Sequence, residues 1–423
     1  MKIDIPADAA RIIDIFEQNG YEAYVVGGCV RDSILGRNPE DWDITTSATP
    51  QQMKELFHKT IDTGIQHGTV TIRMGGCSYE TTTYRIDGEY EDSRHPKSVE
   101  FTSLLSEDLK RRDFTINAMA YSPKQGLVDL FGGIDDLKNR IIRCVGNPNE
   151  RFSEDALRTL RAVRFAGQLD FEIEENTLKA IATAAPNIAN ISVERIRVEI
   201  TKLIMSAGAD RMMIAKETGL TGVFLPEWDK LVCEKKKAED IIDVINEINN
   251  IYEDKGSTEH KILCFAALLH ETGKAQEIMQ RLKFDNYSIN LVDRLTRYCT
   301  YDFDMNKVEF RRFLSSAGTD IMELLYILRQ AYNVKCTGDY AKYIKEVENK
   351  SKNMYNEILE DKDALYIKDL DISGNDLLDA GVPAGKMVGI ILNSLLAYVL
   401  EKPECNEKRW LLKKAEMILE DMK

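Results

Sequence analysis

The sequence lacks a long hydrophobic run, because its longest uninterrupted apolar stretch covers only residues 262–269 of 423. A helix that spans a bilayer needs about 20 apolar residues, so we expect no membrane span and no membrane partner. The first residues, MKIDIPADAAR, lack the basic segment and following apolar segment that are typical of a signal peptide. We therefore expect a cytoplasmic protein.

Closely spaced cysteines are missing as well. The two nearest of the eight, Cys233 and Cys264, lie 31 positions apart, and no C-x-x-C motif occurs. This spacing speaks against a zinc site built from cysteine pairs and against a disulfide framework. We expect reduced thiols, most of them buried.

Positive charge is in deficit, since 56 Lys and Arg face 70 Asp and Glu and leave a formal net charge of −14. This balance argues against indiscriminate binding to nucleic acid, so any contact with RNA should be local. Taken alone, the acidity is explained by solubility. Hydrophobic residues at 43% and charged residues at 30% indicate a globular protein, and the length favours two to four domains.

The chain changes character near residue 148. Up to about residue 145, short β-rich segments such as AYVVGG, TVTIRM and SVEFT alternate with brief helical patterns. From about residue 150 onward, apolar residues recur at helical spacing, and we expect helices with no convincing strand. The segment GNPN at 146–149 separates the two regions, because proline and glycine interrupt regular structure. We predict an α+β fold, a mixed sheet with helices followed by an all-helical remainder.

Acidic side chains stand out in the β-rich region. Residues 24–32, YVVGGCVRD, predict a strand, a two-glycine turn and a helix that ends near Gly36, where backbone N–H groups can approach a phosphate. Asp41 and Asp43 follow, two positions apart in a predicted strand, so both carboxylates project from one face. Glu80 lies in the strand YETTTYR, where a carboxylate is costly unless it is paired or metal-bound. Such oxygen ligands suit Mg²⁺, and three of them on neighbouring strands would hold two ions.

Six motifs occur in a fixed order along the chain: GGCVRD, DWD, YETTTYR, RRDFTINA, DLFGGIDDL and EDALR. Together they closely resemble the class II tRNA nucleotidyltransferases, which are the CCA-adding enzymes and their bacterial poly(A) polymerase relatives. The resemblance covers about residues 20–205. The segments DISGNDLL at 371–378 and GKMVG at 385–389 also resemble the tail of this family.

The resemblance implies a polymerase-β-like nucleotidyltransferase head at 1–148, a helical neck with the nucleotide-selecting helix at 149–217, a helical body at 218–300 and a tRNA-binding helical tail at 301–423. It implies that Asp41 and Asp43 bind the metal and that Glu80 is the third catalytic carboxylate. Arg111 and Arg112 would meet the triphosphate, which suits their forked donors. The other nucleotide-binding candidates in these motifs are Gly28, Arg31, Asp113, Asn117, Glu154, Asp155, Arg158, Arg161 and Arg164.

The spacing in the neck supports base selection independently. In one continuous helix, Glu154, Asp155, Arg158 and Arg161 share an arc opposite the apolar residues. A carboxylate accepts hydrogen bonds and a guanidinium only donates them. Cytosine and adenine each present an amino donor beside a ring-nitrogen acceptor, so an Asp155–Arg158 pair fits either base, whereas uracil and guanine present the reverse pattern. The alternative is an ordinary ion pair on a solvated helix face.

The polar stretch 85–97, between two predicted strands, resembles the flexible loop that full CCA-adding members keep and CC-adding members shorten. An ordinary hairpin loop is the alternative. Farther along, LLHETGK at 268–274 resembles the HD phosphohydrolase motif, but Glu271 stands where that motif has aspartate, and residues 240–251 contain no histidine to add a ligand. We expect a decayed remnant that packs as core, with a metal-dependent phosphohydrolase as the competing class.

These patterns predict an enzyme that adds C, C and A to tRNA 3′ ends without a nucleic-acid template. Its substrates would be CTP and ATP, its cofactor Mg²⁺, and its state a monomer or a homodimer. A CC-only or A-only enzyme, a poly(A) polymerase and a non-catalytic tRNA-binding protein are the alternatives. In the tail, Lys408, Arg409, Lys413 and Lys414 are candidates for contacts with the tRNA backbone, although a solvated helix face explains them equally well.

Overall fold

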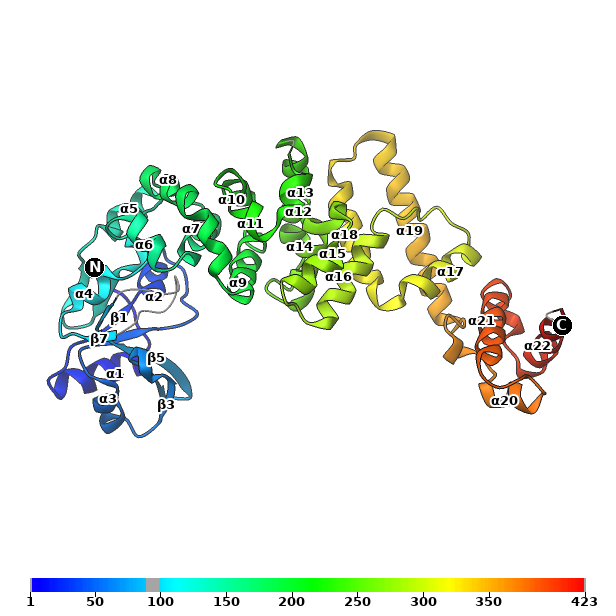
Figure 1. The fold of residues 1–423 in the computed structure, drawn as a ribbon, viewed down its shortest axis with the longest axis horizontal. Helices are drawn as coiled ribbons and strands as arrows, with labels where there is room; N and C mark the ends of the chain where they lie inside the picture. Colours follow the sequence, from blue (N-terminus) through cyan, green and yellow to red (C-terminus); the bar gives the residue numbers. More distant parts are fainter. Residues whose placement is uncertain (1, 89–98, 234, 422–423) are drawn as a thin grey trace. The chain divides into compact units, whose positions relative to one another are not determined.

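The computed structural model describes residues 2–88, 99–233 and 235–421 (Figure 1). The chain divides into two compact units, Met1–Asn249 with Ile278–Lys283, and Asn250–Glu277 with Phe284–Lys423. The finer division predicted at residues 148, 217 and 300 stays a prediction. In the described ranges, no helix combines the length and the apolar character that crossing a membrane requires.

A seven-stranded mixed sheet forms the start of the first unit, in the strand order β3-β4-β5-β2-β1-β8-β9. Its strands are β1 (Ala23–Val26), β2 (Ile44–Thr46), β3 (Thr60–Gly64), β4 (Thr69–Met74), β5 (Cys77–Thr83), β8 (Met119–Ser122) and β9 (Gly126–Asp129). Strands β2 and β5 run parallel, and the other neighbours run antiparallel. The mixed sheet and the helices that follow confirm the predicted α+β class.

Two small ladders accompany the sheet. They pair β6 (Arg85–Asp87) with β7 (Val99–Phe101) and β10 (Ile141–Ile142) with β11 (Glu172–Ile173). The expectation of no strand after residue 150 was wrong for β11. A two-residue strand is too short to show the alternating pattern from which strands are predicted.

Helices pack against this sheet through regularly spaced apolar residues. Those of the sheet region are α1 (Ala7–Gln18), α2 (Gly28–Ile34), α3 (Pro50–Leu56), α4 (Leu105–Lys110) and α5 (Gly133–Asn139). In α1, Ala9, Ile12, Ile13 and Phe16 are buried, which is the spacing of a single helix face. The strand β1 is buried at all four positions. As predicted, α2 follows the two-glycine turn and ends before Gly36.

The break predicted at residues 146–149 is only partly correct, because Gly146 and Asn147 lie between elements, whereas Pro148 and Asn149 are the first two residues of the next helix. Seven helices follow it, namely α6 (Pro148–Glu154), α7 (Leu157–Leu169), α8 (Glu175–Ala184), α9 (Val193–Ile204), α10 (Met212–Glu217), α11 (Leu220–Phe224) and α12 (Pro226–Leu231). The neck helix predicted as continuous is interrupted, because Asp155 has extended backbone angles of φ −144° and ψ 104°. Its Oδ1 accepts a hydrogen bond from the backbone N–H of Leu157 at 3.0 Å, so the aspartate side chain starts α7 instead of continuing α6.

The helix α7 meets another stretch of backbone at close range. A Cβ on Gly167 would lie 2.7 Å from the carbonyl oxygen of Gly208 and 2.7 Å from Cδ1 of Leu203. Real Cβ atoms essentially never come within 3.0 Å of such neighbours. Space, rather than an unusual backbone conformation, therefore requires glycine at residues 167 and 208.

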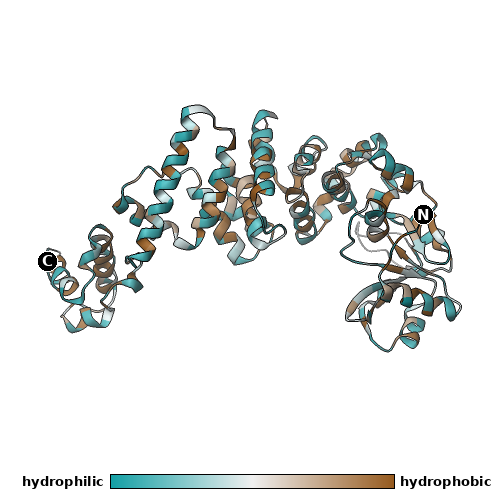
Figure 2. Ribbon diagram, turned by 180° about the vertical axis from the view of Figure 1, so that it is seen from behind, coloured by the Kyte–Doolittle hydropathy of each residue, from teal (hydrophilic) through white to brown (hydrophobic). Residues whose placement is uncertain are grey.

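The second unit consists of helices joined by loops, with no strand among its described residues. It contains α14 (Thr258–Leu269), α16 (Asn286–Tyr298), α17 (Lys307–Ala317), α18 (Met322–Tyr332), α19 (Gly338–Glu360), α20 (Gly374–Asp379), α21 (Lys386–Glu401) and α22 (Lys408–Asp421), while α13 (Lys235–Ile251) and α15 (Ala275–Arg281) contain residues of both units. The apolar run 262–269 is fully buried in α14. Hydrophobic and hydrophilic residues lie on different faces of many helices (Figure 2).

All eight cysteines are free, which agrees with the prediction of reduced thiols. Cys29, Cys144, Cys264 and Cys299 are buried, whereas Cys77 and Cys233 are exposed. Burial therefore applies to half of the thiols and not to most of them.

Candidate active site

The carboxylates predicted to bind metal lie at the centre of the sheet. The prediction that Asp41 and Asp43 lie in a strand was wrong. Asp43 directly precedes β2, and Asp41 lies two residues before Asp43. Ile44 of β2 pairs with Thr81 of β5 in parallel, and one position earlier this register places Asp43 beside Glu80 on the same face. The backbone N–H of Val26 donates to the carbonyl oxygen of Asp43 at 3.0 Å, which holds this extended segment in place.

Crowded negative charge marks this carboxylate face, which consists of Asp41, Asp43 and Glu80. All three residues are open to solvent, yet the protein around Asp43 desolvates its carboxyl and raises the pKa to about 6. Repulsion from Glu80 and Asp41 adds to the rise, and Arg112 opposes it. Among the described residues, no three His, Cys, Asp or Glu side chains form a group that could hold a metal ion. The pair Asp41 and Asp43 nevertheless fits Mg²⁺, which takes one or two carboxylates with waters and phosphate oxygens.

Beside this face, the predicted arginine pair is held by a carboxylate that the sequence analysis missed. Asp108 of α4 is completely buried. Its Oδ1 accepts from Nε and Nη2 of Arg111 at 3.0 and 2.7 Å, and its Oδ2 accepts from Nη2 of Arg112 at 3.2 Å and Oγ1 of Thr45 at 3.1 Å. Burial alone would raise the pKa of Asp108, but the two guanidinium groups lower it. The i,i+3 and i,i+4 spacing in DLKRR was the available signal.

The two glycines of the turn differ in whether the structure requires a glycine at their position. Gly27 has φ +82°, and a Cβ there would lie 3.2 Å from Nη1 of Arg112. Gly28, the residue predicted, begins α2, and a Cβ on it would make only an ordinary contact of 3.7 Å with Nη2 of Arg31. Backbone conformation and the approach of Arg112 therefore require glycine at residue 27, which sequence reasoning did not single out.

Four of the predicted residues form one hydrogen-bonded chain. Arg31 Nη1 donates to Asn117 Oδ1 at 2.7 Å, and Asn117 Nδ2 donates to Asp113 Oδ1 at 3.2 Å. Arg161 then donates to Asp113 Oδ2 through Nε and Nη2 at 3.0 and 2.7 Å. Burial would raise the pKa of Asp113, but Arg161 holds it at about 2. The chain ties α2 to α7, so these side chains hold each other in place.

The two residues predicted to read the base have separate partners. Arg158 donates from Nη1 to Glu154 at 2.5 Å and from Nη2 to the backbone carbonyl of Arg111 at 3.0 Å. Asp155 pairs instead with Arg195 of α9, with Nη2 2.6 Å from Oδ2. The break between α6 and α7 explains why the pair drawn on a continuous helix is not formed. Sequence reasoning missed Arg195, because no local spacing links α9 to residue 155.

Arg164 is the most enclosed of the predicted arginines, with 6% relative exposure. Its Nε lies 2.5 Å from Glu199 Oε2, and its guanidinium carbon lies 3.9 Å from the centre of the Phe165 ring. Burial lowers the pKa of Arg164 to about 10, although Glu199 opposes the shift. These internal contacts support α7, and a nucleotide contact for Arg164 stays a prediction.

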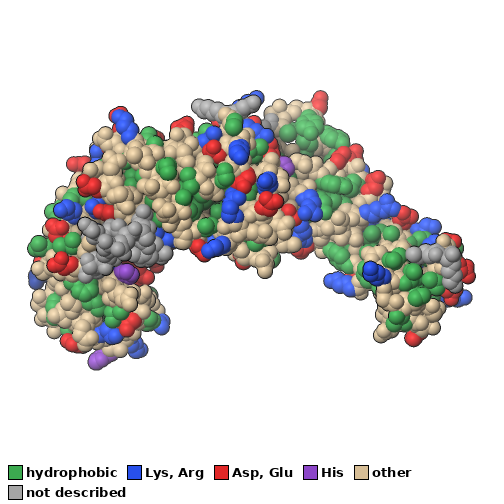
Figure 3. Space-filling view, viewed as in Figure 1, with side chains coloured by type: hydrophobic (Ala, Val, Ile, Leu, Met, Phe, Trp, Pro, Cys, Tyr) green, Lys and Arg blue, Asp and Glu red, His purple; other side chains and the backbone are tan. Residues whose placement is uncertain are grey.

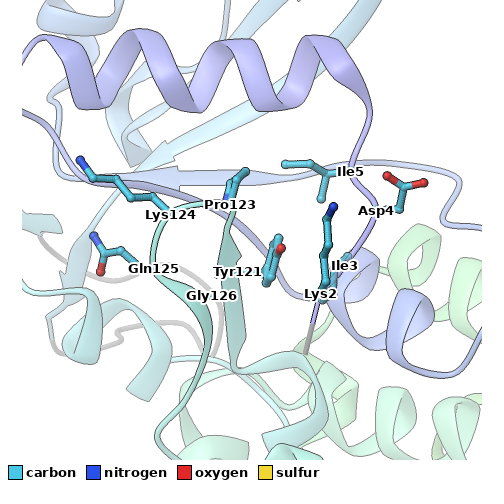
Figure 4. Close-up of a pocket in the computed structure, with 9 residues that line it drawn as sticks. All are labelled: Lys2, Ile3, Asp4, Ile5, Tyr121, Pro123, Lys124, Gln125 and Gly126. Atoms are coloured by element: carbon cyan, nitrogen blue, oxygen red, sulfur yellow. The ribbon is translucent and has the colours of Figure 1, made fainter.

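A cavity of about 610 Å³ lies near the turn between β8 and β9 (Figure 4). It is lined by Lys2, Ile3, Asp4, Ile5, Tyr121, Pro123, Lys124, Gln125 and Gly126. None of the predicted site residues lines it, so the cavity does not define the site. The predicted switching loop falls largely on residues 89–98, outside the described residues, and its role stays a prediction.

The HD-like segment offers little for metal chemistry. The residues before His270 are core, the His270 ring packs edge-on against Tyr332 with centroids 5.1 Å apart, and Glu271 is exposed. Burial lowers the pKa of His270, which favours a neutral ring. The surrounding packing agrees with a remnant that serves the core.

The basic residues predicted for the tail are only partly available. Lys408 Nζ lies 2.5 Å from Asp376 Oδ1, and Lys414 Nζ lies 5.0 Å from the centre of the Tyr398 ring. Arg409 and Lys413 are exposed. Acidic and basic side chains are interspersed on the visible face of the molecule (Figure 3), and the contacts with tRNA stay a prediction.

The mixed sheet, the carboxylate face and the adjacent arginine pair define a nucleotidyltransferase of the poly(A) polymerase head type. Residues 23–143 match the Poly A polymerase head domain, residues 170–231 match the probable RNA and SrmB-binding site of polymerase A, and residues 257–415 match the putative tRNA nucleotidyltransferase domain 2.

Relatives of known function match almost the whole chain. The CCA-adding enzyme of Leuconostoc mesenteroides is 36% identical over 400 residues, which cover 92% of this chain and 90% of the relative. That of Ligilactobacillus salivarius is 36% identical over 99% of this chain and 98% of its own. The crystal structure of the Bacillus stearothermophilus CCA-adding enzyme with CTP is 31% identical, with a TM-score of 0.78 over 98% of each chain. The chain belongs to the CCA-adding enzymes, the class II tRNA nucleotidyltransferases.

Proposed function

We propose that this protein adds C, C and A to the 3′ end of tRNA, using CTP and ATP and releasing pyrophosphate. The observation that carries the proposal is the match of nine-tenths of the chain to CCA-adding enzymes, with the six head and neck motifs present in order. Full CCA addition is preferred to CC-only addition because the stretch 85–97 resembles the flexible loop that full CCA-adding members keep. A poly(A) polymerase is disfavoured because the relatives that match more than nine-tenths of the chain are CCA-adding enzymes.

In this proposal, Asp41 and Asp43 hold the divalent metal, which family membership implies and which we assign as Mg²⁺, and Glu80 is the third carboxylate. A metal held by these carboxylates would supply the Lewis acid that activates the RNA 3′-hydroxyl for attack on the α-phosphate and that stabilises the leaving oxygen. Arg111 and Arg112 bind the triphosphate, so their positive charge offsets the charge of the leaving pyrophosphate. The chain Arg31–Asn117–Asp113–Arg161 keeps this region rigid, which is the main requirement when catalysis relies on positioning.

Base selection is assigned to Asp155 and Arg158. The contacts of Arg158 with Glu154 and with the carbonyl oxygen of Arg111 aim its guanidinium from two sides. Asp155 is aimed by Arg195. A donor and an acceptor fixed in this way complement the edges of cytosine and adenine, and they leave the reversed edges of uracil and guanine without partners.

The proposal also covers the domains, the tRNA contacts, the location and the oligomeric state. We assign residues 1–148 to the head, 149–217 to the neck, 218–300 to the body and 301–423 to a tail that binds tRNA, with exposed Arg409 and Lys413 as candidates for backbone contacts. We also assign the protein to the cytoplasm as a monomer or homodimer. Size-exclusion chromatography with light scattering distinguishes the two states.

One experiment tests the proposed function directly. The protein is incubated with tRNA that lacks its terminal CCA, with CTP and ATP singly and together, and the 3′ ends are sequenced. We expect CC with CTP alone and CCA with both nucleotides, and chelation of divalent metal abolishes both. Products that end at CC with both nucleotides, or runs of A, would contradict the proposal.

A further inference from the structure

The buried carboxylate of Asp108 joins two parts of the site. It accepts hydrogen bonds from Arg111 and Arg112, and also from Thr45 of β2, which lies two residues after Asp43. The contact therefore connects the arginine pair to the strand that follows the metal-binding candidates. A buried carboxylate is costly without partners, so three independent partners around one carboxylate indicate a built cluster.

The two arginines depend on Asp108 to different degrees. Among the described residues, the Asp108 contact is the one side-chain hydrogen bond of Arg112, whose buried Nε has no partner there. Arg111 uses Nε and Nη2 on the same carboxylate, and its backbone carbonyl accepts from Arg158. Without the carboxylate, the two guanidinium groups would repel each other, and Arg112 would lose the one side-chain hydrogen bond described for it.

We propose that Asp108 is a positioning residue for nucleotidyl transfer, which holds the guanidinium groups of Arg111 and Arg112 in the orientation that binds the nucleotide triphosphate. The inference rests on the proposed function, because it presupposes that the arginine pair binds triphosphate. Asp108 does not touch the substrate. Its role is to fix the direction of the two arginines and to leave them one net positive charge.

The test is the variant Asp108→Asn, with Glu107→Gln on the same helix as the matched control. Glu107 is partly exposed, and its nearest described cation, Lys110, is 3.9 Å away, so its loss should change little. For Asp108→Asn we expect the KM for CTP and for ATP to rise by a common factor of roughly 10 or more, with a much smaller change in kcat. An unchanged KM, or an equal rise in Glu107→Gln, would overturn the inference.

A second comparison guards against misfolding, because Asp108→Asn leaves two cations near each other. In Arg111→Gln, which removes one of them, adding Asp108→Asn should raise the KM for the nucleotide by a clearly smaller factor than in wild type. Equal factors in the two backgrounds would mean that Asp108 does not act through the arginines. If wild-type protein incorporates neither CTP nor ATP, the proposed function itself fails, whereas an active wild type with an unaffected Asp108→Asn variant refutes only the positioning role.

Discussion

The carboxylate face and the arginine cluster lie side by side in the first unit and differ in how they are held. Asp41, Asp43 and Glu80 are exposed and form no ion pair with another described residue. Arg111, Arg112 and Arg161, by contrast, lie against the enclosed carboxylates Asp108 and Asp113. The difference agrees with our proposal, in which the exposed carboxylates take a metal as their partner and the arginines that bind the substrate are fixed by other side chains.

The largest effect is expected from a change on the exposed carboxylate face. Asp43→Asn removes the proposed metal ligand without removing a packing group, so incorporation of CTP and of ATP should fall together by about 100-fold or more. The midpoint of thermal unfolding and the affinity for tRNA should stay close to wild type. Glu40→Gln, the same change at an exposed neighbour, serves as the control. Activity above roughly a tenth of wild type would contradict the metal assignment.

The next effect concerns an arginine that other protein groups hold in place. Arg158→Ala should lower the use of CTP and ATP and raise the relative use of UTP, because the wrong base no longer faces a fixed donor. A lost bidentate contact corresponds to roughly 5- to 150-fold in discrimination. Single-nucleotide incorporation assays measure this ratio, with Lys179→Ala on the exposed face of α8 as the control. A common fall for all four nucleotides would show that Arg158 serves phosphate binding or structure instead.

A smaller effect tests whether the ion pair of Asp113 with Arg161 contributes to the stability of the fold. The pKa of Asp113 is lowered to about 2, so its pairing stabilises the folded state above the ordinary carboxyl pKa and is lost as the pH falls through the folded value. Asp113→Asn should therefore reduce the free energy of unfolding by about 2 kcal/mol at pH 7. Urea unfolding should show the difference narrowing between pH 4 and pH 2. A difference that does not depend on pH would point to lost packing rather than to the ion pair.

The smallest effect is expected at His270. Because its partly buried ring packs against Tyr332 and lies outside the proposed site, His270→Ala should leave nucleotide incorporation within about twofold of wild type, with only a lower unfolding midpoint. The wild-type protein should release no phosphate from a 2′,3′-cyclic phosphate substrate. Release that disappears in His270→Ala would instead support a phosphohydrolase.

Local patterns allowed much of the fold to be predicted from the sequence. The strand, two-glycine turn and helix at residues 24–34 follow from side-chain spacing and glycine conformation, and so does the burial of residues 262–269. The placement of Glu80 beside Asp43 needed the parallel pairing of β2 with β5, which joins segments 37 positions apart. The motif resemblance grouped Glu80 with Asp41 and Asp43 as the third carboxylate, but neither it nor periodicity predicted the strand pairing.

The errors have a common cause. The arc predicted for residues 154–161 assumed one continuous helix. The side chain of Asp155, however, accepts a backbone hydrogen bond, which favours ending one helix and starting another. Arg195 and Glu199 were missed because they reach the site from α9, far along the chain. Asp108 differed, since its spacing to the arginines was visible, but a carboxylate before two arginines reads equally well as a surface ion pair.

The close approach of Gly167 and Gly208 predicts a temperature-sensitive phenotype for a substitution at either glycine. A methyl group at residue 208 would press on α7 at Gly167, and α7 also carries Arg158 and Arg161. Gly208→Ala would thus alter the helix without altering any group that touches a nucleotide. Such a change is expected to behave as a conditional allele, with growth at low temperature and failure at high temperature.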